Sequence, residues 1–463
     1  MEASVTRQSG QLPLRQVQFM TLRETRRGRR LPRDTAIIAL LSLVYSATVQ
    51  PLITAFMLTS DIQTFATISL LTMHVFRCFS IMSPFKLAAL PLMFTVAIVQ
   101  MGSMLYLHSI FILFSFILSG ILHGSLKTIF QAYTVHLAKR NIFARPNFIY
   151  DSNRLFMFFG IAKALELIGN ALGFFIIAGT YPADSSIKFE TPCGTEFCFF
   201  THGDNLISSV SSLSNFFTIY ERKFIPVSTQ FILYSLLCIG VFASTMPLRS
   251  IHSAFIDTAA DQSPIDVLSK TAFNDLFPLG MASGYLDVFI FYEISNSVIY
   301  CVMCNMGNVC TVITCVLLFT VISIIFIATI ITNSVKVDTL PVFCAALTGT
   351  GCMAVLWLWH PVQGDQPMLY IILFSSSVTS LVFTLISYRG VLERHGGDNG
   401  VMSIEFCREL GGAIAFLVRL HPCMREKVIA ASVIICASIS PFLFKQLIKK
   451  RSAAQQHLSS VSL

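Results

Sequence analysis

Long, nearly uninterrupted apolar runs recur along most of this 463-residue chain. Each is about as long as the roughly 20 residues that a helix needs to cross a bilayer. Pro, Gly and charged residues divide them into twelve candidate spans. Their approximate limits are 34–57, 62–82, 85–105, 108–137, 154–179, 228–247, 278–301, 303–332, 338–359, 367–388, 403–420 and 427–447. The weakest are the second, which carries His74 and Arg77, and the eleventh, which opens with Glu405, Arg408 and Glu409.

The composition supports a membrane protein and excludes a soluble enzyme. Charged residues make up 12% of the chain and hydrophobic residues 54%, whereas a soluble domain carries about 25% charged residues. An outer-membrane barrel would show alternating segments of about ten residues instead of long apolar runs. No phosphate-binding loop, nucleophile elbow or catalytic triad is present. We therefore predict an all-α polytopic, non-enzymatic protein with no catalytic residues, no metal site and no cofactor.

Two longer polar segments, 180–227 and 248–277, interrupt the series of short loops and set the predicted domain layout. The basic N-terminal segment has no apolar core of a cleavable signal peptide, so the first span is expected to direct insertion. Six spans on either side of a central polar linker are typical of major-facilitator folds. The predicted parts are a basic cytoplasmic tail 1–33, an N-terminal six-helix half 34–247 with an outer loop 180–227, a cytoplasmic linker 248–277, a C-terminal six-helix half 278–447 and a cytoplasmic tail 448–463.

The distribution of Lys and Arg predicts the orientation. With the N-terminus inside, 24 of these residues fall on the cytoplasmic side and six on the outer side, the latter including Arg419 and Lys427. Cytoplasmic loops carry an excess of basic residues, so both termini are expected in the cytoplasm of a multi-pass protein, at the plasma membrane or an endomembrane. The basic run before the first span is interpreted as a topology signal, with a lipid-sensing or partner-binding tail as the alternative.

Span four carries His123, Lys127 and Thr134 at helical spacing, with Gln131 near the same face. A charged side chain at the centre of a bilayer costs at least about 2.5–3.5 kcal/mol. Lys127 should therefore face the interior of the bundle, either in a structural ion pair or in a polar cavity that binds a solute or ion.

Span five carries Lys163 and Glu166, three residues apart and so on neighbouring faces of one helix. They could neutralise each other, or Glu166 could pair with Lys127 in the adjacent span. Both alternatives stay open at this point.

Span seven carries two carboxyl groups. Asp287 and Glu293 are six residues apart and do not share a helix face, whereas Glu293 and Ser297 do. A lone carboxyl at this depth is expected to be protonated and to act as a hydrogen-bonding group. That group could serve a proton relay or a helix–helix contact.

The cysteines point to one disulfide in the outer loop. Cys193 and Cys198 are separated by four residues, which allows a turn that brings them within bridging distance on the oxidising side of a membrane. Cys301, Cys304 and Cys310 mimic a metal-binding spacing, but they lack His or carboxylate partners. We interpret these three as apolar filler.

Several segments, in the right order over roughly residues 100–420, resemble the UNC-ninety-three-like family. The span-seven run SGYLDVFIFYEISNSVIYC matches its pattern of Ser-Gly, Phe, Glu, Ser and Cys. The matching positions here are Ser283, Gly284, Phe289, Glu293, Ser297 and Cys301. Shorter matches are CGTEFC in the outer loop, Gly120 with Gln131-Ala-Tyr133, Asn153 to Phe156 with Gly169-Asn170, MAVLWLWHP at 353–361, and Arg408 with Gly412 to Phe416.

The resemblance implies a twelve-span, facilitator-like fold and an accessory role. In one branch it implies a regulatory subunit of a two-pore potassium channel, and in another the escort of Toll-like receptors. The expected partners are therefore the lipid bilayer and other integral membrane proteins, with potassium channel subunits as candidates, and no nucleic acid. Two departures are a span ten without a carboxylate, from Ser377 to Thr384, and a missing Gly/Asp/Arg signature after span two.

Three functions follow as hypotheses. The first is a regulatory subunit, most plausibly of a potassium channel. The second is a secondary transporter of a small solute, and the third is a trafficking chaperone for membrane receptors. The transporter hypothesis predicts a central cavity lined by His123, Lys127, Glu166, Asp287 and Glu293.

Overall fold

The computed structural model describes thirteen stretches of the chain. They are residues 31–59, 63–82, 89–106, 110–122, 152–180, 194–196, 227–245, 276–303, 305–333, 339–362, 365–395, 398–421 and 423–461. All structural statements below concern these residues. The basic tail 1–30 and most of the outer loop and of the central linker lie outside them.

Helices account for nearly all of the described chain, and each of the twelve predicted spans contains one. In the N-terminal part they are α2 (Leu31–Thr59), α3 (Gln63–Met82), α4 (Ala89–Tyr106), a helix over Ile110–Leu122, α6 (Ser152–Thr180) and α8 (Val227–Ser244). The C-terminal part contains α11 (Leu276–Val288), the π-helix η4 (Phe289–Ile299), α12 (Tyr300–Met303), α13 (Met306–Asn333), α14 (Thr339–Leu358), α15 (Gln366–His395), α16 (Asp398–Arg419) and α17 (Met424–Val461). A short 3₁₀ helix, η1 (Gly194–Glu196), lies between α6 and α8 in the chain, within the segment predicted as an outer loop.

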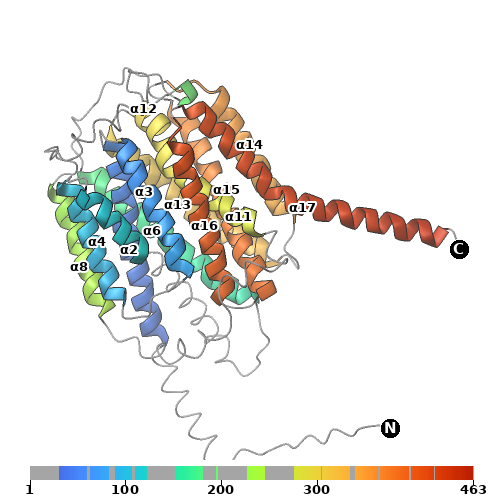
Figure 1. Ribbon diagram of the computed structural model, residues 1–463, viewed down its shortest axis with the longest axis horizontal. Coiled ribbons are helices and arrows are strands. Elements are labelled where there is room, and N and C mark those ends of the chain that lie inside the picture. The colour runs from blue at the N-terminus through green and yellow to red at the C-terminus, as the bar shows by residue number, and fades with distance from the viewer. Residues whose placement is uncertain are drawn as a thin grey trace, which may run out of the picture.

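The helices form one bundle with their long axes roughly aligned, and the C-terminal part of α17 projects away from it (Figure 1). Within the described residues, seven helical segments are long and apolar enough to cross a membrane, and four shorter apolar helices accompany them. Large apolar side chains such as Phe175, Phe242, Phe326 and Phe444 are exposed on the outside of the bundle. A surface of this kind is suited to lipid.

Helices from the two parts of the chain pack directly against each other. The principal contacts between them join α6 to α13 and α3 to α16, and α15 also contacts α6. The second and eleventh spans, whose charges made them the weakest in the sequence, thus lie side by side. His74 and Arg77 of the second span pair with Glu409 of the eleventh.

Glycines set the close approach between helices that carry the polar residues. A Cβ added at Gly173 of α6 would lie 2.0 Å from the carbonyl oxygen of Ala47 on α2. A Cβ at Gly284 of α11 would lie 1.9 Å from the carbonyl oxygen of Arg408 on α16, and one at Gly411 would lie 2.0 Å from that of Met281. Only residues without a side chain allow these backbones to touch.

The seventh span changes its winding in the middle. It begins as α11, continues as η4 from Phe289, and ends as α12. The Ser295 hydroxyl donates to the carbonyl oxygen of Ile290, five residues back, which is the spacing of a π-helix. This segment carries Glu293.

Candidate functional site

A cavity of about 270 Å³ lies between the two parts of the bundle. Side chains from α2, α3 and α6 line one side, and those from α11, η4, α13, α15 and α16 line the other. Lys163, Asp287 and Arg408 each lie ten to eleven residues from the start of their helix. At 1.5 Å per residue this is about 15 Å, or half of a bilayer core. The cavity therefore lies along these helices at a distance from their first residues that equals about half the thickness of a bilayer core.

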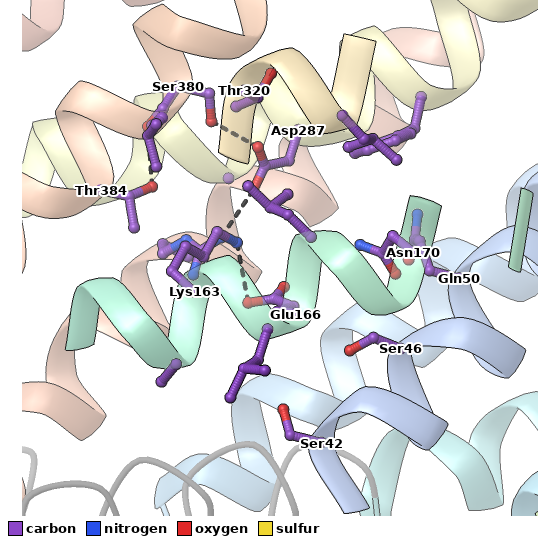
Figure 2. Close-up of a pocket in the computed structure, with 18 of the residues that line it drawn as sticks. Ser42, Ser46, Gln50, Lys163, Glu166, Asn170, Asp287, Thr320, Ser380 and Thr384 are labelled. Carbon is purple, nitrogen blue, oxygen red and sulfur yellow. Dashed lines mark hydrogen bonds and ion pairs between the residues drawn. The ribbon is translucent and has the colours of Figure 1, made fainter. Parts of the chain in front are cut away.

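Two polar rows face each other on the side of the cavity formed by the N-terminal part (Figure 2). Ser42, Ser46 and Gln50 are spaced by four residues along α2. Lys163 and Glu166 lie on α6, where the Lys163 ammonium donates to Glu166 Oε2 at 3.0 Å. This is the mutual neutralisation that the sequence left open as one alternative.

Asp287 projects from α11 on the opposite side of the cavity. Arg408 Nη2 donates to Asp287 Oδ2 at 2.7 Å, and the Ser380 hydroxyl donates to Asp287 Oδ1 at 2.5 Å. The Asp287 side chain is 33% exposed, whereas that of Arg408 is 4% exposed. The Asp287 carboxylate is therefore the accessible member of this pair, and it faces the cavity.

Arg408 also binds a second, fully buried carboxylate. Its Nη1 donates to Glu405 Oε1 at 2.9 Å, and the Tyr388 hydroxyl donates to the same oxygen. Burying two charges is costly unless they are paired and hydrogen-bonded. Here one guanidinium joins the carboxylates of α11 and α16.

A second charged group ties α3 to α16 beside the cavity. His74 Nδ1 lies 2.7 Å from Glu409 Oε2, and Arg77 Nη1 lies 3.6 Å from the same oxygen. The His74 ring also packs against Phe416, with 5.2 Å between ring centroids. All three ionisable residues line the cavity.

A third group, centred on Glu293, lies toward the end of the bundle where α16 ends and α17 begins. Arg419 Nη1 donates to Glu293 Oε1 at 2.8 Å, and Lys427 Nζ donates to Oε2 at 2.9 Å. Arg419 Nε also donates to the Thr67 hydroxyl of α3 at 3.1 Å. These side chains are buried, so the group closes this end of the bundle with a charged, hydrogen-bonded plug.

The structure describes five of the eight residues proposed as an intramembrane polar group. Lys163, Glu166 and Asp287 line the cavity, whereas Glu293 belongs to the plug. The Ser297 hydroxyl donates to the backbone carbonyl of Glu293 at 2.7 Å, not to its carboxylate. Outside the described residues lie His123, Lys127, Gln131, Cys193 and Cys198.

Two sequence interpretations are wrong. Glu293 is not a lone carboxyl, because two buried cations from α16 and α17 bind it. The sequence-based orientation placed Arg419 and Lys427 in an outer loop. It therefore did not predict that they bind Glu293. Cys301 is not apolar filler, because it is disulfide-bonded, as is Cys423. Cys310 is a buried free thiol, and Cys304 lies outside the described residues.

Sequence reasoning also missed residues that the structure brings to the site. In the sequence, Arg408 and Glu409 stand out as charges that weaken the eleventh span, and Arg408 and Asn170 as part of the family resemblance, but none of the three is predicted at the site. His74 and Arg77 weakened the second span in the same way. The sequence did contain a signal for this site. The second and eleventh spans carry charges of opposite sign, and such charges inside a membrane usually pair with one another.

Comparisons with known proteins identify the fold but no close relative. No family model matches the chain, and no curated protein sequence matches it. Among solved structures, it is similar to the nucleoside transporter NupG, with a TM-score of 0.58 and 10% identity over 89% of this chain and 99% of that one.

Two further similar structures are transporters. A bacterial homologue of the iron transporter ferroportin, in an outward-facing state, has a TM-score of 0.55 and 10% identity over 89% of this chain and 98% of that one. The major facilitator superfamily transporter FucP, in an outward conformation, has a TM-score of 0.52 and 11% identity over 87% of this chain and 96% of that one. The chain is thus an all-α, multi-pass membrane protein with a major-facilitator-like fold.

Proposed function

We propose that this protein is a secondary transporter of a small polar solute. The observation that carries the proposal is the cavity between the two parts of the bundle, which exposes the Asp287 carboxylate and the Lys163–Glu166 pair. Intramembrane ionisable groups around a cavity mark solute or ion pathways. In facilitator folds the substrate site lies near the midplane, and access alternates between the two sides.

In this mechanism α3 and α16 are the helices that move apart, and polar contacts between them hold the cavity closed. Glu409 binds His74 and Arg77 across that interface, and Arg419 binds Thr67 closer to the plug. These contacts hold together helices from the two parts of the chain. Opening the cavity toward the plug would require α3 and α16 to separate, and these polar contacts would then break.

The transporter hypothesis has more support than the potassium channel subunit that the family resemblance suggested. The similar structures are a nucleoside transporter, a major facilitator superfamily transporter and a bacterial homologue of an iron transporter. Span ten lacks a carboxylate, yet its hydroxyl residues Ser377, Ser380 and Thr384 line the cavity. A channel subunit and a receptor chaperone remain predictions from the family resemblance.

The test compares solute distributions in cells that express the wild type, Asp287→Asn or Glu426→Gln. Glu426 is a matched control, because its side chain is 49% exposed and does not line the cavity. The reference is the solute profile of cells that do not express the protein. At equal abundance in the membrane, the wild type and Glu426→Gln should change the cellular level of at least one small polar solute from this reference, and Asp287→Asn should not. Identical solute profiles for all three, with a changed potassium current, would support the channel subunit instead.

A further inference from the structure

We infer that the cavity binds a neutral, polyhydroxylated solute, such as a sugar, a polyol or a nucleoside. This inference rests on the proposed transport function and names its substrate class. Three independent features of the described lining carry it: paired charges, an excess of hydrogen-bond acceptors, and a buried amide oxygen that has no partner among the described residues.

Each acidic side chain that lines the described part of the cavity has a basic partner. Arg408 is shared with the buried Glu405, and His74 also lies beside Glu409. Among the described lining residues, the basic side chains are Arg77, Lys163 and Arg408, and the acidic ones are Glu166, Asp287 and Glu409. Each acidic side chain lies within 4 Å of a basic one. A solute with a net charge would lose its hydration and find no uncompensated counter-charge here, which disfavours its binding. A neutral solute does not meet this penalty.

The hydroxyl groups of the lining are arranged as acceptors. Thr320 donates its proton to the carbonyl oxygen of Val316 at 2.7 Å, and Thr384 donates to that of Ser380 at 2.9 Å. Ser380 donates to Asp287. A hydroxyl has one proton and two lone pairs, so these oxygens remain able to accept. Their preferred ligand is a molecule with several O–H or N–H donors.

Asn170 supplies the third feature. It lies on α6 and is 6% exposed, and its Oδ1 has no hydrogen-bond partner among the described residues. Figure 2 shows it beside Gln50, at one end of the polar rows. Gln50 donates to the Tyr292 hydroxyl at 3.0 Å. A buried amide oxygen without a partner is unfavourable, and a solute hydroxyl would satisfy it.

The shape of the cavity agrees with a solute of this class. Its volume of about 270 Å³ lies just below the range of drug-sized pockets. Tyr45, Phe291 and Tyr292 add aromatic surface to the lining. Apolar rings beside a few directed polar groups are typical of sites that orient a small molecule.

The test uses purified full-length protein in proteoliposomes and four radiolabelled probes: glucose, uridine, lactate and choline. We expect uptake of glucose or uridine and none of lactate or choline. Asn170→Leu should weaken the apparent affinity for the neutral probe about two- to tenfold, the effect of losing one hydrogen bond. Ser235→Ala removes a hydroxyl from the exposed face of α8 and serves as the control with unchanged affinity.

The outcomes separate the two proposals. Uptake of lactate or choline instead of the neutral probes would overturn the substrate class and leave transport intact. Neutral uptake with full affinity in Asn170→Leu would overturn the role of the amide. No uptake of any probe, together with identical solute profiles in the cell comparison, would overturn both proposals. Melting temperatures of the variants show whether each one is folded.

Discussion

Arg419, the last residue of α16, donates to the carboxylate of Glu293 in the middle of η4 at 2.8 Å, and Lys427 of α17 binds the other oxygen. One carboxylate thus binds two buried cations from consecutive helices. The connection between α16 and α17 is short, so the plug also fixes where the eleventh span ends and the twelfth begins. Its polar contact with Thr67 extends this closure to α3.

Replacing Glu293 should destabilise the protein strongly. Glu293→Gln leaves Arg419 and Lys427 buried without an anion, and breaking a buried ion pair costs about 3–5 kcal/mol. We expect a clear fall in melting temperature in detergent, measured by intrinsic fluorescence. Glu426→Gln, at an exposed position beside Lys427, should leave the melting temperature unchanged. Equal melting temperatures for the two variants would contradict the plug.

Two glycine-to-alanine replacements should distinguish the effect of a helix–helix contact on folding from the effect of helix propensity. Gly284→Ala places a methyl group 1.9 Å from the Arg408 carbonyl oxygen, so α11 and α16 must move apart. We expect poor folding and little protein in the membrane. Gly351→Ala is the matched control, because no atom lies within 4 Å of the added Cβ and alanine favours a helix by about 1 kcal/mol. Similar abundance of both variants would show that this contact is not required.

Weakening the polar contacts between α3 and α16 should favour opening of the cavity at the end of the bundle where the plug lies. Glu409→Gln keeps the shape of the side chain but weakens its binding to His74 and Arg77. In the orientation predicted from the sequence, the plug faces the outside of the cell. With a reporter thiol at the cavity residue Ser377, we then expect faster reaction with a membrane-impermeant maleimide applied outside the cell. Unchanged or slower labelling would mean that these contacts do not hold the cavity closed.

The oxidation states of the cysteines can be mapped directly. Eight described cysteines, including Cys310 and Cys407, are free thiols, whereas Cys301 and Cys423 are disulfide-bonded. Alkylation of unfolded, unreduced protein should modify the free thiols and spare Cys301 and Cys423 until a reductant is added. Peptide mapping of the unreduced protein identifies their partners. Alkylation of either one before reduction would contradict the assignment.

The same peptide map tests the sequence-based pairing of Cys193 with Cys198. A bridge between these two residues would appear as one outer-loop peptide. Linkage of either residue to a distant peptide would show that the prediction is wrong.

Hydrophobic length predicted the helices well, because the cost of burying polar backbone in lipid leaves few alternatives. All twelve predicted spans contain a described helix, including the second and eleventh. The π-helical winding at Glu293 was not predictable, since it depends on how η4 packs against its neighbours.

The site was predicted less completely than the fold. Lys163, Glu166 and Asp287 were proposed from their cost in a bilayer, and they line the cavity. Arg408 and Asn170 were missed as cavity residues, because helix periodicity does not reveal which helices face each other. Tertiary contact between α11 and α16, set by Gly284 and Gly411, places Arg408 against Asp287.

The central claim is that the cavity opens to both sides of the membrane. Its most direct test is the reaction of Ser377→Cys with an impermeant maleimide in intact cells and in inside-out vesicles. The exposed thiols Cys238, Cys344 and Cys436 are replaced by alanine, and the parent with Ser377 intact is the control. For a transporter, we expect the thiol to react from both sides and a transported solute to slow both reactions. Reaction from one side only, under every condition tried, would contradict alternating access and with it the transporter.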